Sequence, residues 1–365
     1  MSLVVALGGQ ESRFSRAFAL TRVAIHRGAF PGATLAVVYR GALVVCQGFG
    51  RFTYQADSPL VEPDTVFDLA SLTKVVATTA MAMILYEREV LGLQSPVADL
   101  LPEFVSLAPR GQQAERRRVI LRMLLAHSSG LPAYLKLFES AHTRDELIRA
   151  ACAVPLAWQP GTRAQYSDIG FILLGEILAR LAGTPLDTFL AKELFAPLGM
   201  TRTCFNPSAE WKAAIPPTED DRTFRRRVLQ GEVNDENAWV MSGVSGHAGL
   251  FSCAADVARF AACMLRGGRP VLGPGTVELF ARREMSPAGT SRTIGWDTPS
   301  QPSSSGRYFS PGSFGHLGFT GTSLWIDPQR QLSVVLLTNR TWPDRGSQNI
   351  KPFRPLLHDA IVEAL

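Results

Sequence analysis

Ser71 and Lys74 stand three residues apart at the start of a long apolar run that extends to about Leu93. If Ser71 lies in the first turn of a helix, this spacing brings the amine of Lys74 back over the serine hydroxyl. A serine hydroxyl is a weak nucleophile at its own pKa and needs such a neighbour. Unpaired N–H groups of a first helical turn also favour negative charge on Ser71 or on a carbonyl that it attacks. The pair predicts nucleophilic catalysis, although a helix start with a solvated lysine has the same spacing.

A second candidate group lies in the polar loop 160–168, directly ahead of an apolar helical pattern at 169–182. Tyr166 stands two residues before Asp168, so both side chains can point into one cleft. A lysine ammonium close to the phenol would favour its phenolate, which can act as a general base. The structural alternative is a half-buried tyrosine in a helix-entry turn, with Asp168 as the cap.

A third candidate stretch, residues 315–322, is rich in glycine and leads into a β-rich run. Glycine at 315, 318 and 321 would allow a substrate backbone to lie against the edge of that strand. His316 can then donate a hydrogen bond or supply charge at the rim. Taken alone, a glycine-rich turn with an incidental histidine explains the stretch equally well.

In combination, the three stretches resemble the serine hydrolases related to class C β-lactamases and penicillin-binding DD-peptidases. The motifs of that family are S-x-x-K, then Y-x-N, then K-T-G or H-x-G on a strand. Here Ser71–Lys74, Tyr166–Asp168 and His316–Gly318 follow in the same order, with similar gaps. Accessory stretches match as well, and the resemblance covers residues 15 to 362; these stretches are residues 124–132, 194–200 and 249–252.

The resemblance implies two-step acyl transfer, in which Ser71 attacks a carbonyl and Lys74 and Tyr166 share the proton relay. The backbone N–H groups of Ser71 and Phe319 would form the oxyanion hole, a type of donor commonly worth about 3 kcal/mol in the transition state. Substrate-binding roles would fall to Asp168, His316, Gly318 and His247. No metal and no organic cofactor is implied.

Residues 231–238 and 246–249 resemble one branch of the family, described as β-lactamase-like proteins or penicillin-binding carboxypeptidases. His247 is therefore a candidate for the cleft lining, or alternatively a satisfied core histidine. Asp235 and Glu236 could recognise an amine of the substrate or cap a helix. We favour a role in the site for these carboxylates.

Two positions depart from the family pattern. Asp168 stands where the family usually has Asn, and its charge would repel a substrate carboxylate and hold Lys74 more firmly protonated. His316 replaces the Lys of K-T-G, which removes a permanent positive charge at neutral pH. Both changes weaken a β-lactamase interpretation, whereas H-x-G is common among the esterases and peptidases of the family. Asn349 and Arg354, near the C-terminal helix, are further candidates for carboxylate binding in compensation.

The elements that must position these residues have strand patterns at both ends of the chain and helical patterns between them. We therefore expect an α/β (α+β) fold, with an antiparallel sheet flanked by helices, built from both chain ends, and an inserted, mostly helical domain. The sheet subdomain would span about 1–70 and 240–365, and the helical subdomain about 71–239. Residues 206–237 read as a long polar excursion of a kind that is often functional or mobile. An amphipathic helix is expected over residues 11–27.

Composition limits the other classes of function. The hydrophobic content of 46% and charged content of 19% are ordinary for a globular protein. Arginine triplets at 116–118 and 225–227 lack any nucleic-acid motif, so no nucleic-acid partner is expected. Five widely spaced cysteines without C-x-x-C predict neither a disulfide framework nor a zinc site.

No convincing signal peptide and no bilayer-spanning stretch is present. The chain as written is expected to be cytoplasmic, or periplasmic if its start is trimmed or misassigned.

The substrate class stays open among a β-lactam, a D-amino-acid peptide and a small carboxylic ester. Alternatives are a small-ester carboxylesterase of the same fold, or a non-catalytic homologue that binds peptidoglycan fragments or a protein partner. The presence of Ser71, Lys74 and Tyr166 together favours an enzyme. A helical scaffold with chance motifs would have to explain three motifs in order. The oligomeric state is not predicted.

Overall fold

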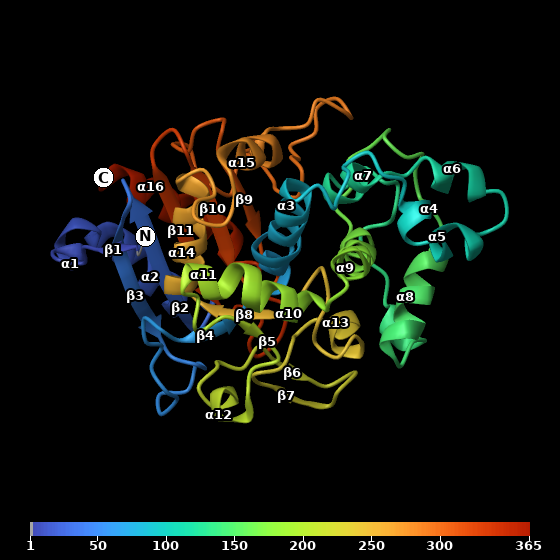
Figure 1. Cartoon of the computed structure of the whole chain (residues 1–365). Coiled ribbons are helices and arrows are strands. Elements are labelled where there is room, and N and C mark those ends of the chain that lie inside the picture. The colour runs from blue at the N-terminus through green and yellow to red at the C-terminus, as the bar shows by residue number, and fades with distance from the viewer. Residues whose placement is uncertain (1–2) are drawn as a thin grey trace.

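A six-stranded sheet joins the two ends of the chain in the order β1-β3-β2-β11-β10-β9 in the computed structural model, which describes residues 3–365 (Figure 1). Its strands are β1 (Val4–Val5), β2 (Gly32–Tyr39), β3 (Ala42–Gly50), β9 (Phe314–Leu317), β10 (Ser323–Asp327) and β11 (Leu332–Thr338). A three-stranded sheet has the order β4-β8-β5, and β6 pairs with β7. These strands are β4 (Val66–Asp68), β5 (Cys204–Phe205), β6 (Glu219–Asp221), β7 (Arg227–Leu229) and β8 (Leu250–Cys253).

The pairing of β2 with β11 joins the two halves of the sheet, because it places an N-terminal strand beside a C-terminal one. β2 and β3 form the expected hairpin, because Arg40 and Gly41 both adopt the left-handed conformation that a two-residue turn requires. Apart from the short parallel pair of β1 and β3, the pairs in this sheet are antiparallel. The expectation of a sheet built from both chain ends and flanked by helices is confirmed.

Helices cover both faces of this sheet. α2 (Ser15–His26) packs with α16 (Ile350–Glu363), and α14 (Ala254–Leu265) packs on β2 and β11. Alternate residues of β2 point to opposite faces. Leu35 and Val37 join the cluster under α2 and α16, whereas Ala36 and Val38 join the larger core. Both faces of β2 are buried for this reason, and the strand is a continuous apolar run.

The other helices are distributed along the chain, with α4 to α8 on the right of Figure 1 and α1 at its left edge beside β1. They are α1 (Gln10–Arg13), α3 (Ala80–Glu87), α4 (Val97–Leu100), α5 (Glu103–Ser106), α6 (Gln113–Arg117), α7 (Leu121–Leu125), α8 (Arg144–Ala153), α9 (Asp168–Ala182), α10 (Leu186–Leu190), α11 (Ala196–Leu198), α12 (Ala209–Lys212), α13 (Glu236–Val240) and α15 (Pro274–Ala281). Short 3₁₀ or π segments are η1 (Ala70–Leu72), η2 (Lys74–Thr79), η3 (Leu137–Glu139) and η4 (Ala191–Phe195).

Local structure differs from expectation in three places. The helix expected over 11–27 divides at Phe14, whose buried side chain accompanies a non-helical backbone. The helix expected from Ser71 onward consists of the 3₁₀ turn η1, the π-helix η2 and then α3. The polar excursion 206–237 holds α12 and the β6–β7 hairpin. The subdomain boundaries near 70 and 240 stay a prediction.

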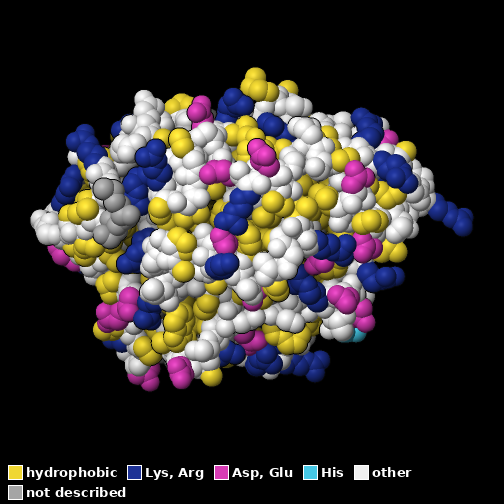
Figure 2. Space-filling model, in the orientation of Figure 1, with side chains coloured by type: hydrophobic (Ala, Val, Ile, Leu, Met, Phe, Trp, Pro, Cys, Tyr) yellow, Lys and Arg dark blue, Asp and Glu magenta, His cyan; other side chains and the backbone are white. Residues whose placement is uncertain are grey.

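The face shown in Figure 2 carries basic and acidic side chains interspersed, without one continuous patch of either sign. Over residues 3–365, no helix by itself combines the length and apolar character needed to cross a membrane. One bent pair, α9 with residues 186–198, meets those criteria only when its two parts are taken together.

Candidate active site

Ser71 is presented by a strained turn between β4 and η2. The backbone of Ala70 has φ 46°, a left-handed conformation that non-glycine residues rarely adopt. The buried carboxylate of Asp68 accepts the N–H of Ala70 at 2.8 Å and so stabilises this turn. Thr320 Oγ1 and Thr322 Oγ1, in the loop between β9 and β10, donate to the carbonyl oxygens of residues 68 and 69. Strain of this kind, imposed by surrounding contacts, is frequent at functional sites.

Lys74 lies fully buried behind the serine. Its Nζ donates to Ser71 Oγ at 3.1 Å and to the carbonyl oxygen of His247 at 3.0 Å, and it lies 2.6 Å from Asp168 Oδ1. These three partners match the three protons of an ammonium group. Burial acts to lower the pKa of Lys74, but the charge and hydrogen bonds of Asp168 and Tyr166 outweigh it, and the pKa is raised.

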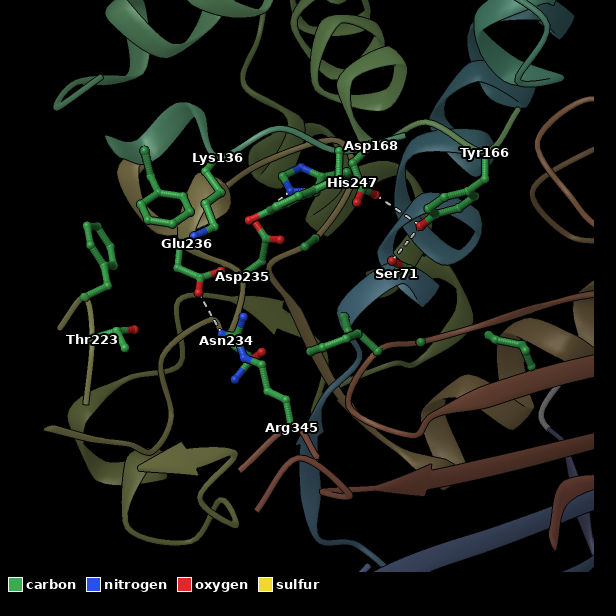
Figure 3. Close-up of a pocket in the computed structure, with 18 of the residues that line it drawn as sticks. Ser71, Lys136, Tyr166, Asp168, Thr223, Asn234, Asp235, Glu236, His247 and Arg345 are labelled. Carbon is green, nitrogen blue, oxygen red and sulfur yellow. Dashed lines mark hydrogen bonds and ion pairs between the residues drawn. The ribbon is translucent and has the colours of Figure 1, made fainter. Parts of the chain in front are cut away.

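Tyr166 stands on the other side of the serine. Its Oη lies 2.9 Å from Ser71 Oγ and donates to Asp168 Oδ1 at 3.1 Å, so the three side chains form a row (Figure 3). Burial, together with the charge of Asp168, raises the pKa of Tyr166 to about 12, although Lys74 acts in the opposite direction. Lys74 thus favours the phenolate, as expected, but burial and the charge of Asp168 outweigh its effect. Tyr166 is a neutral phenol in the resting site.

The loop that carries Tyr166 and Asp168 is held in place by contacts of Ser167, the residue between them. Ser167 caps α9 by accepting the N–H of Gly170 at 3.0 Å. The Nδ1 atom of His127 accepts the N–H of Ser167 at 3.1 Å, and its ring packs between Tyr166 and Phe171. Burial lowers the pKa of His127 well below its usual range, so the imidazole that holds Ser167 is neutral. The sequence offered His127 only as part of an accessory stretch, without a role.

His316 lies on β9, and its ring packs near the ring of Tyr166, with 5.9 Å between the two ring centroids. Its Nδ1–H donates to the carbonyl oxygen of Leu317 at 2.8 Å. Burial, with the charges of Lys74 and Arg292, lowers the pKa of His316 well below its usual range. The single N–H of the neutral imidazole is therefore used on Leu317, and Nε2 is left as a hydrogen-bond acceptor. Neither of the two expected contributions of His316, positive charge or hydrogen-bond donation to a substrate, is available in this state.

The residues after His316 form the edge beside Ser71. A Cβ atom on Gly318 would lie 1.9 Å from Thr322 Oγ1, so only glycine fits at this position. Phe319 is 46% exposed, and within residues 3–365 its backbone N–H makes no hydrogen bond. An open N–H beside the nucleophile is the property that an oxyanion-hole donor needs. The oxyanion roles of Ser71 and Phe319 remain a prediction.

A cavity of about 700 Å³ opens over Ser71, and Tyr166 and Asp168 form one side of it (Figure 3). Gly318 and Phe319 line it from the strand side. The facing wall combines aromatic, acidic and basic side chains. These are Tyr134, Lys136, Phe138, Glu139, Phe224, Asp235, Glu236, His247 and Arg345.

His247 and Asp235 form a buried pair within that wall. His247 Nε2 lies 2.8 Å from Asp235 Oδ1, and His247 Nδ1 lies 2.8 Å from Ser245 Oγ. Asp235 also caps α13 through the N–H of Ala238. Burial acts to raise the pKa of Asp235, but His247 and the N–H of Ala238 outweigh it, and the pKa falls to about 2. His247 is thus both a satisfied buried histidine and part of the cavity lining, and Asp235 caps a helix while it also lines the cavity. Recognition of a substrate amine by Asp235 or Glu236 stays a prediction.

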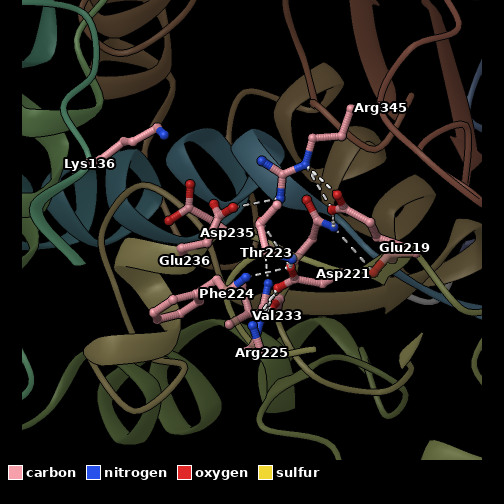
Figure 4. A network of polar contacts seen from close by, with 12 residues as sticks. Lys136, Glu219, Asp221, Thr223, Phe224, Arg225, Val233, Asp235, Glu236 and Arg345 are labelled. Carbon is pink, nitrogen blue, oxygen red and sulfur yellow. Dashed lines mark hydrogen bonds and ion pairs between the residues drawn. The ribbon is translucent and has the colours of Figure 1, made fainter. Parts of the chain in front are cut away.

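Arg345 connects two segments of the facing wall through ion pairs with Glu219 and Glu236 (Figure 4). Its Nε donates to Glu219 and its Nη2 contacts Glu236, each at 2.8 Å. Asn234 Nδ2 donates to the same Glu219 at 2.9 Å, and the N–H of Asn234 reaches Asp68 Oδ2 at 2.7 Å. Nothing in the sequence singled out Arg345, which stands in an irregular loop more than a hundred residues from its partners. The strained turn at Ser71 and the wall that faces it thus share Asp68.

Two further candidates do not reach the cavity. Asn349 donates to the carbonyl oxygen of Arg27 at 3.1 Å, and Arg354 is buried and donates to the carbonyl oxygens of Gly318 and Thr322. Arg354 supports the glycine-rich edge from behind. The structure therefore does not support carboxylate binding by either residue. Across residues 3–365, no three His, Cys, Asp or Glu side chains form a group that could hold a metal ion.

A model of the family described as Beta-lactamase matches residues 19–354, and the chain therefore belongs to this family. An N-acetylmuramyl-L-alanine amidase of Bacillus subtilis (strain 168) is 35% identical over 346 residues, which cover 85% of this chain and 77% of the relative. A putative D-alanyl-D-alanine carboxypeptidase of Salmonella agona (strain SL483) is 31% identical over 364 residues, covering 88% and 82%.

Solved structures show the same fold. EstCE1, a hydrolase with promiscuous acyltransferase activity, superposes with a TM-score of 0.79 at 22% identity, covering 96% of this chain and 98% of its own. The octameric penicillin-binding protein homologue from Pyrococcus abyssi gives a TM-score of 0.74 at 21% identity, covering 96% and 76%. The family and its named relatives confirm the predicted resemblance, and the protein is a serine hydrolase.

Proposed function

We propose that this hydrolase cleaves an amide bond of a peptidoglycan fragment, between an N-acetylmuramyl group and the first alanine of the peptide. The observation that carries the proposal is the hydrogen bonding of Ser71 Oγ to Tyr166 and Lys74 on the floor of an open cavity. A hydroxyl placed between two polar partners and an open N–H is suited to attack on a carbonyl. The relative named N-acetylmuramyl-L-alanine amidase supports this choice of bond.

The wall that faces Ser71 supports a sugar on the acyl side of the bond. Tyr134 and Phe319 are each partly exposed, and the carboxylates of Asp235 and Glu236 lie nearby. Pockets bind their ligands through apolar and aromatic surface with a few placed polar groups. Aromatic faces with carboxylate acceptors suit a ring that carries several hydroxyl groups.

The charges near Ser71 argue against a substrate whose carboxylate adjoins the scissile bond. Asp168 is an anion beside the nucleophile, and His316 is neutral. Arg345 is already paired with two glutamates, and Lys136, which pairs with Glu139 at 3.3 Å, has 64% of its side chain exposed. A carboxylate further along a peptide can reach Lys136. Within residues 3–365, the lysine and arginine side chains that line the cavity are Lys136 and Arg345, and both are paired with glutamates. A carboxylate next to the reacting carbonyl, as in a D-alanyl-D-alanine terminus or a β-lactam, would therefore meet no unpaired cation among them.

A competition of substrates tests this proposal. Wild type and Ser71→Ala would each receive N-acetylmuramyl-L-alanyl-D-isoglutamine, a peptide ending in D-alanyl-D-alanine, a chromogenic cephalosporin and p-nitrophenyl butyrate. We expect Ser71-dependent release of L-alanyl-D-isoglutamine, with at least tenfold lower kcat/KM for the D-alanyl peptide and the cephalosporin. Release of D-alanine without cleavage of the muramyl amide would contradict the proposal and favour a carboxypeptidase.

A further inference from the structure

Asp168 occupies a position from which it can exchange a proton with the reaction centre. It is the first residue of α9, and its Oδ1 lies 2.6 Å from Lys74 Nζ and 3.1 Å from Tyr166 Oη. Tyr166 Oη lies in turn 2.9 Å from Ser71 Oγ (Figure 3). An unbroken row of hydrogen bonds therefore leads from the nucleophile to a carboxylate that borders the cavity.

The other neighbours of Ser71 are poorly suited to accept its proton. Lys74 is surrounded by three acceptors, Ser71 Oγ, Asp168 Oδ1 and the carbonyl oxygen of His247, and an ammonium has no lone pair. Tyr166 is a protonated phenol whose own O–H points to Asp168. A phenol in this state can take a proton from Ser71 only as it releases its own.

We propose that Asp168 is the terminal acceptor of the proton that leaves Ser71, and that Tyr166 relays it. As the bond from Ser71 Oγ to the carbonyl carbon forms, one electron pair of the C=O bond moves onto oxygen. The hydroxyl proton passes to Tyr166 Oη, and the phenol proton passes to Asp168 Oδ1. The carboxylate becomes a neutral carboxylic acid, while Lys74 remains an ammonium throughout.

The same row returns the proton when the tetrahedral intermediate collapses. The C–N bond breaks, Tyr166 gives its proton to the leaving nitrogen, and Asp168 restores the proton of Tyr166. The acyl-enzyme then has Ser71 as an ester and Asp168 ionised again. In deacylation, a water oxygen bonds to the carbonyl carbon while one of its protons passes through Tyr166 to Asp168. The bond from the carbonyl carbon to Ser71 Oγ then breaks, the proton returns through Tyr166 to Ser71 Oγ, and the carboxylic acid leaves.

An asparagine, the usual residue of the family at this position, would keep the hydrogen-bond geometry but not the chemistry. Its amide oxygen can accept from Tyr166 and Lys74 but cannot take up a proton near neutral pH. Asp168→Asn therefore separates proton acceptance from positioning. Charged and titratable groups around the Lys74–Asp168 pair come from several neighbouring elements, and they include His127, Tyr134, Asp235, His247, Arg292 and His316. Of these, His127 and His316 stay neutral through burial, so they add no charge change near pH 6.

The experiment compares Asp168→Asn with wild type on the muramyl amide and on p-nitrophenyl butyrate, with Asp57→Asn as a control that removes an exposed carboxylate elsewhere. We expect a fall in kcat/KM of roughly 10²- to 10⁴-fold for the amide. The ester, whose nitrophenolate leaves without a proton, should lose at least about tenfold less. The acidic decline of the wild-type pH profile should disappear in Asp168→Asn, and Asp168→Glu should regain part of the activity.

Equal losses on both substrates with an unchanged pH profile would reduce Asp168 to a positioning residue and overturn the inference. A proton inventory on wild type in mixed H₂O and D₂O covers the case in which Asp168→Asn does not fold. Two protons in flight give a curved plot, and a linear plot would contradict the relay. The inference rests on the proposed function only for the amide. If the muramyl amide is not cleaved, the pH profile and proton inventory on the ester still test it.

Discussion

The reaction centre and the wall that faces it are held together in different ways. Lys74 has no exposed side-chain surface, and its partners Ser71 and Asp168 come from short motifs at the starts of helical segments. The facing wall depends on Arg345, whose side chain is 34% exposed and which bridges two glutamates from separate segments. In the proposed function, the chemistry is therefore carried out by buried side chains with several partners each, and recognition of the substrate by a network that is partly exposed.

Asp68 connects the two regions. One carboxylate oxygen holds the strained N–H of Ala70 beside the nucleophile, and the other holds the N–H of Asn234 in the wall. The position of the wall relative to Ser71 therefore depends on one buried acid. Changes within either region should affect different kinetic constants, and a change at Asp68 should affect both.

The largest effect that we expect from the reaction centre alone is that of Tyr166→Phe. This change removes the hydroxyl that lies between Ser71 and Asp168 and leaves the ring to pack against His127. We expect kcat on the ester to fall roughly 10²- to 10⁴-fold, with KM within about threefold of wild type. Steady-state kinetics at neutral pH would measure this. A variant with raised KM and unchanged kcat would mean that Tyr166 binds substrate and does not move protons.

Asp68→Asn should change the pH dependence of stability. Burial raises the pKa of Asp68 to about 6, so between about pH 4 and pH 6 the folded state holds a proton that the unfolded state has lost. Stability contributed by the protonated acid is therefore lost as the pH rises through this window. The free energy of unfolding of wild type, relative to Asp68→Asn, should fall by up to about 3 kcal/mol between pH 4 and pH 7.

Urea unfolding of both proteins at several pH values would measure this difference. Groups with lowered pKa values, such as Asp235 and Asp221, are present in both proteins, so their opposite pH dependence cancels. A difference that does not change between pH 4 and pH 7 would show that Asp68 titrates normally.

Arg345→Gln should have the smallest effect and should act on the wall alone. The change removes the ion pairs with Glu219 and Glu236 but no contact of Ser71. We expect KM for the muramyl amide to rise about tenfold with kcat within about threefold, and stability to fall by about 1 kcal/mol, because the pairs are partly exposed. Substrate titrations and thermal unfolding would measure these quantities. A large loss of kcat without a change in KM would remove the distinction between the two regions.

The sequence was sufficient where short-range patterns determine the structure. The Arg40–Gly41 turn predicted the β2–β3 hairpin, and the apolar run at 169–182 predicted α9, which the core surrounds. The order of Ser71, Tyr166 and His316 predicted residues that the fold does bring to one cavity or its edge.

Features that depend on long-range burial could not be predicted in this way. The protonated state of Tyr166 follows from its burial beside an ionised carboxylate, and neither condition is visible in a motif. The left-handed turn at Ala70 is stabilised by the side chain of Asp68 and by contacts from the loop between β9 and β10. Arg345 enters the wall through a loop whose position is set only by the complete fold.

The central claim is that Ser71 forms a covalent acyl-enzyme. Rapid acid quenching during turnover of p-nitrophenyl butyrate, followed by peptide mass spectrometry, tests this claim most directly. We expect a butyryl group on the peptide that contains Ser71, a burst of nitrophenol in wild type, and neither signal in folded Ser71→Ala. An acyl group on a different side chain, or undiminished turnover by Ser71→Ala, would contradict the account.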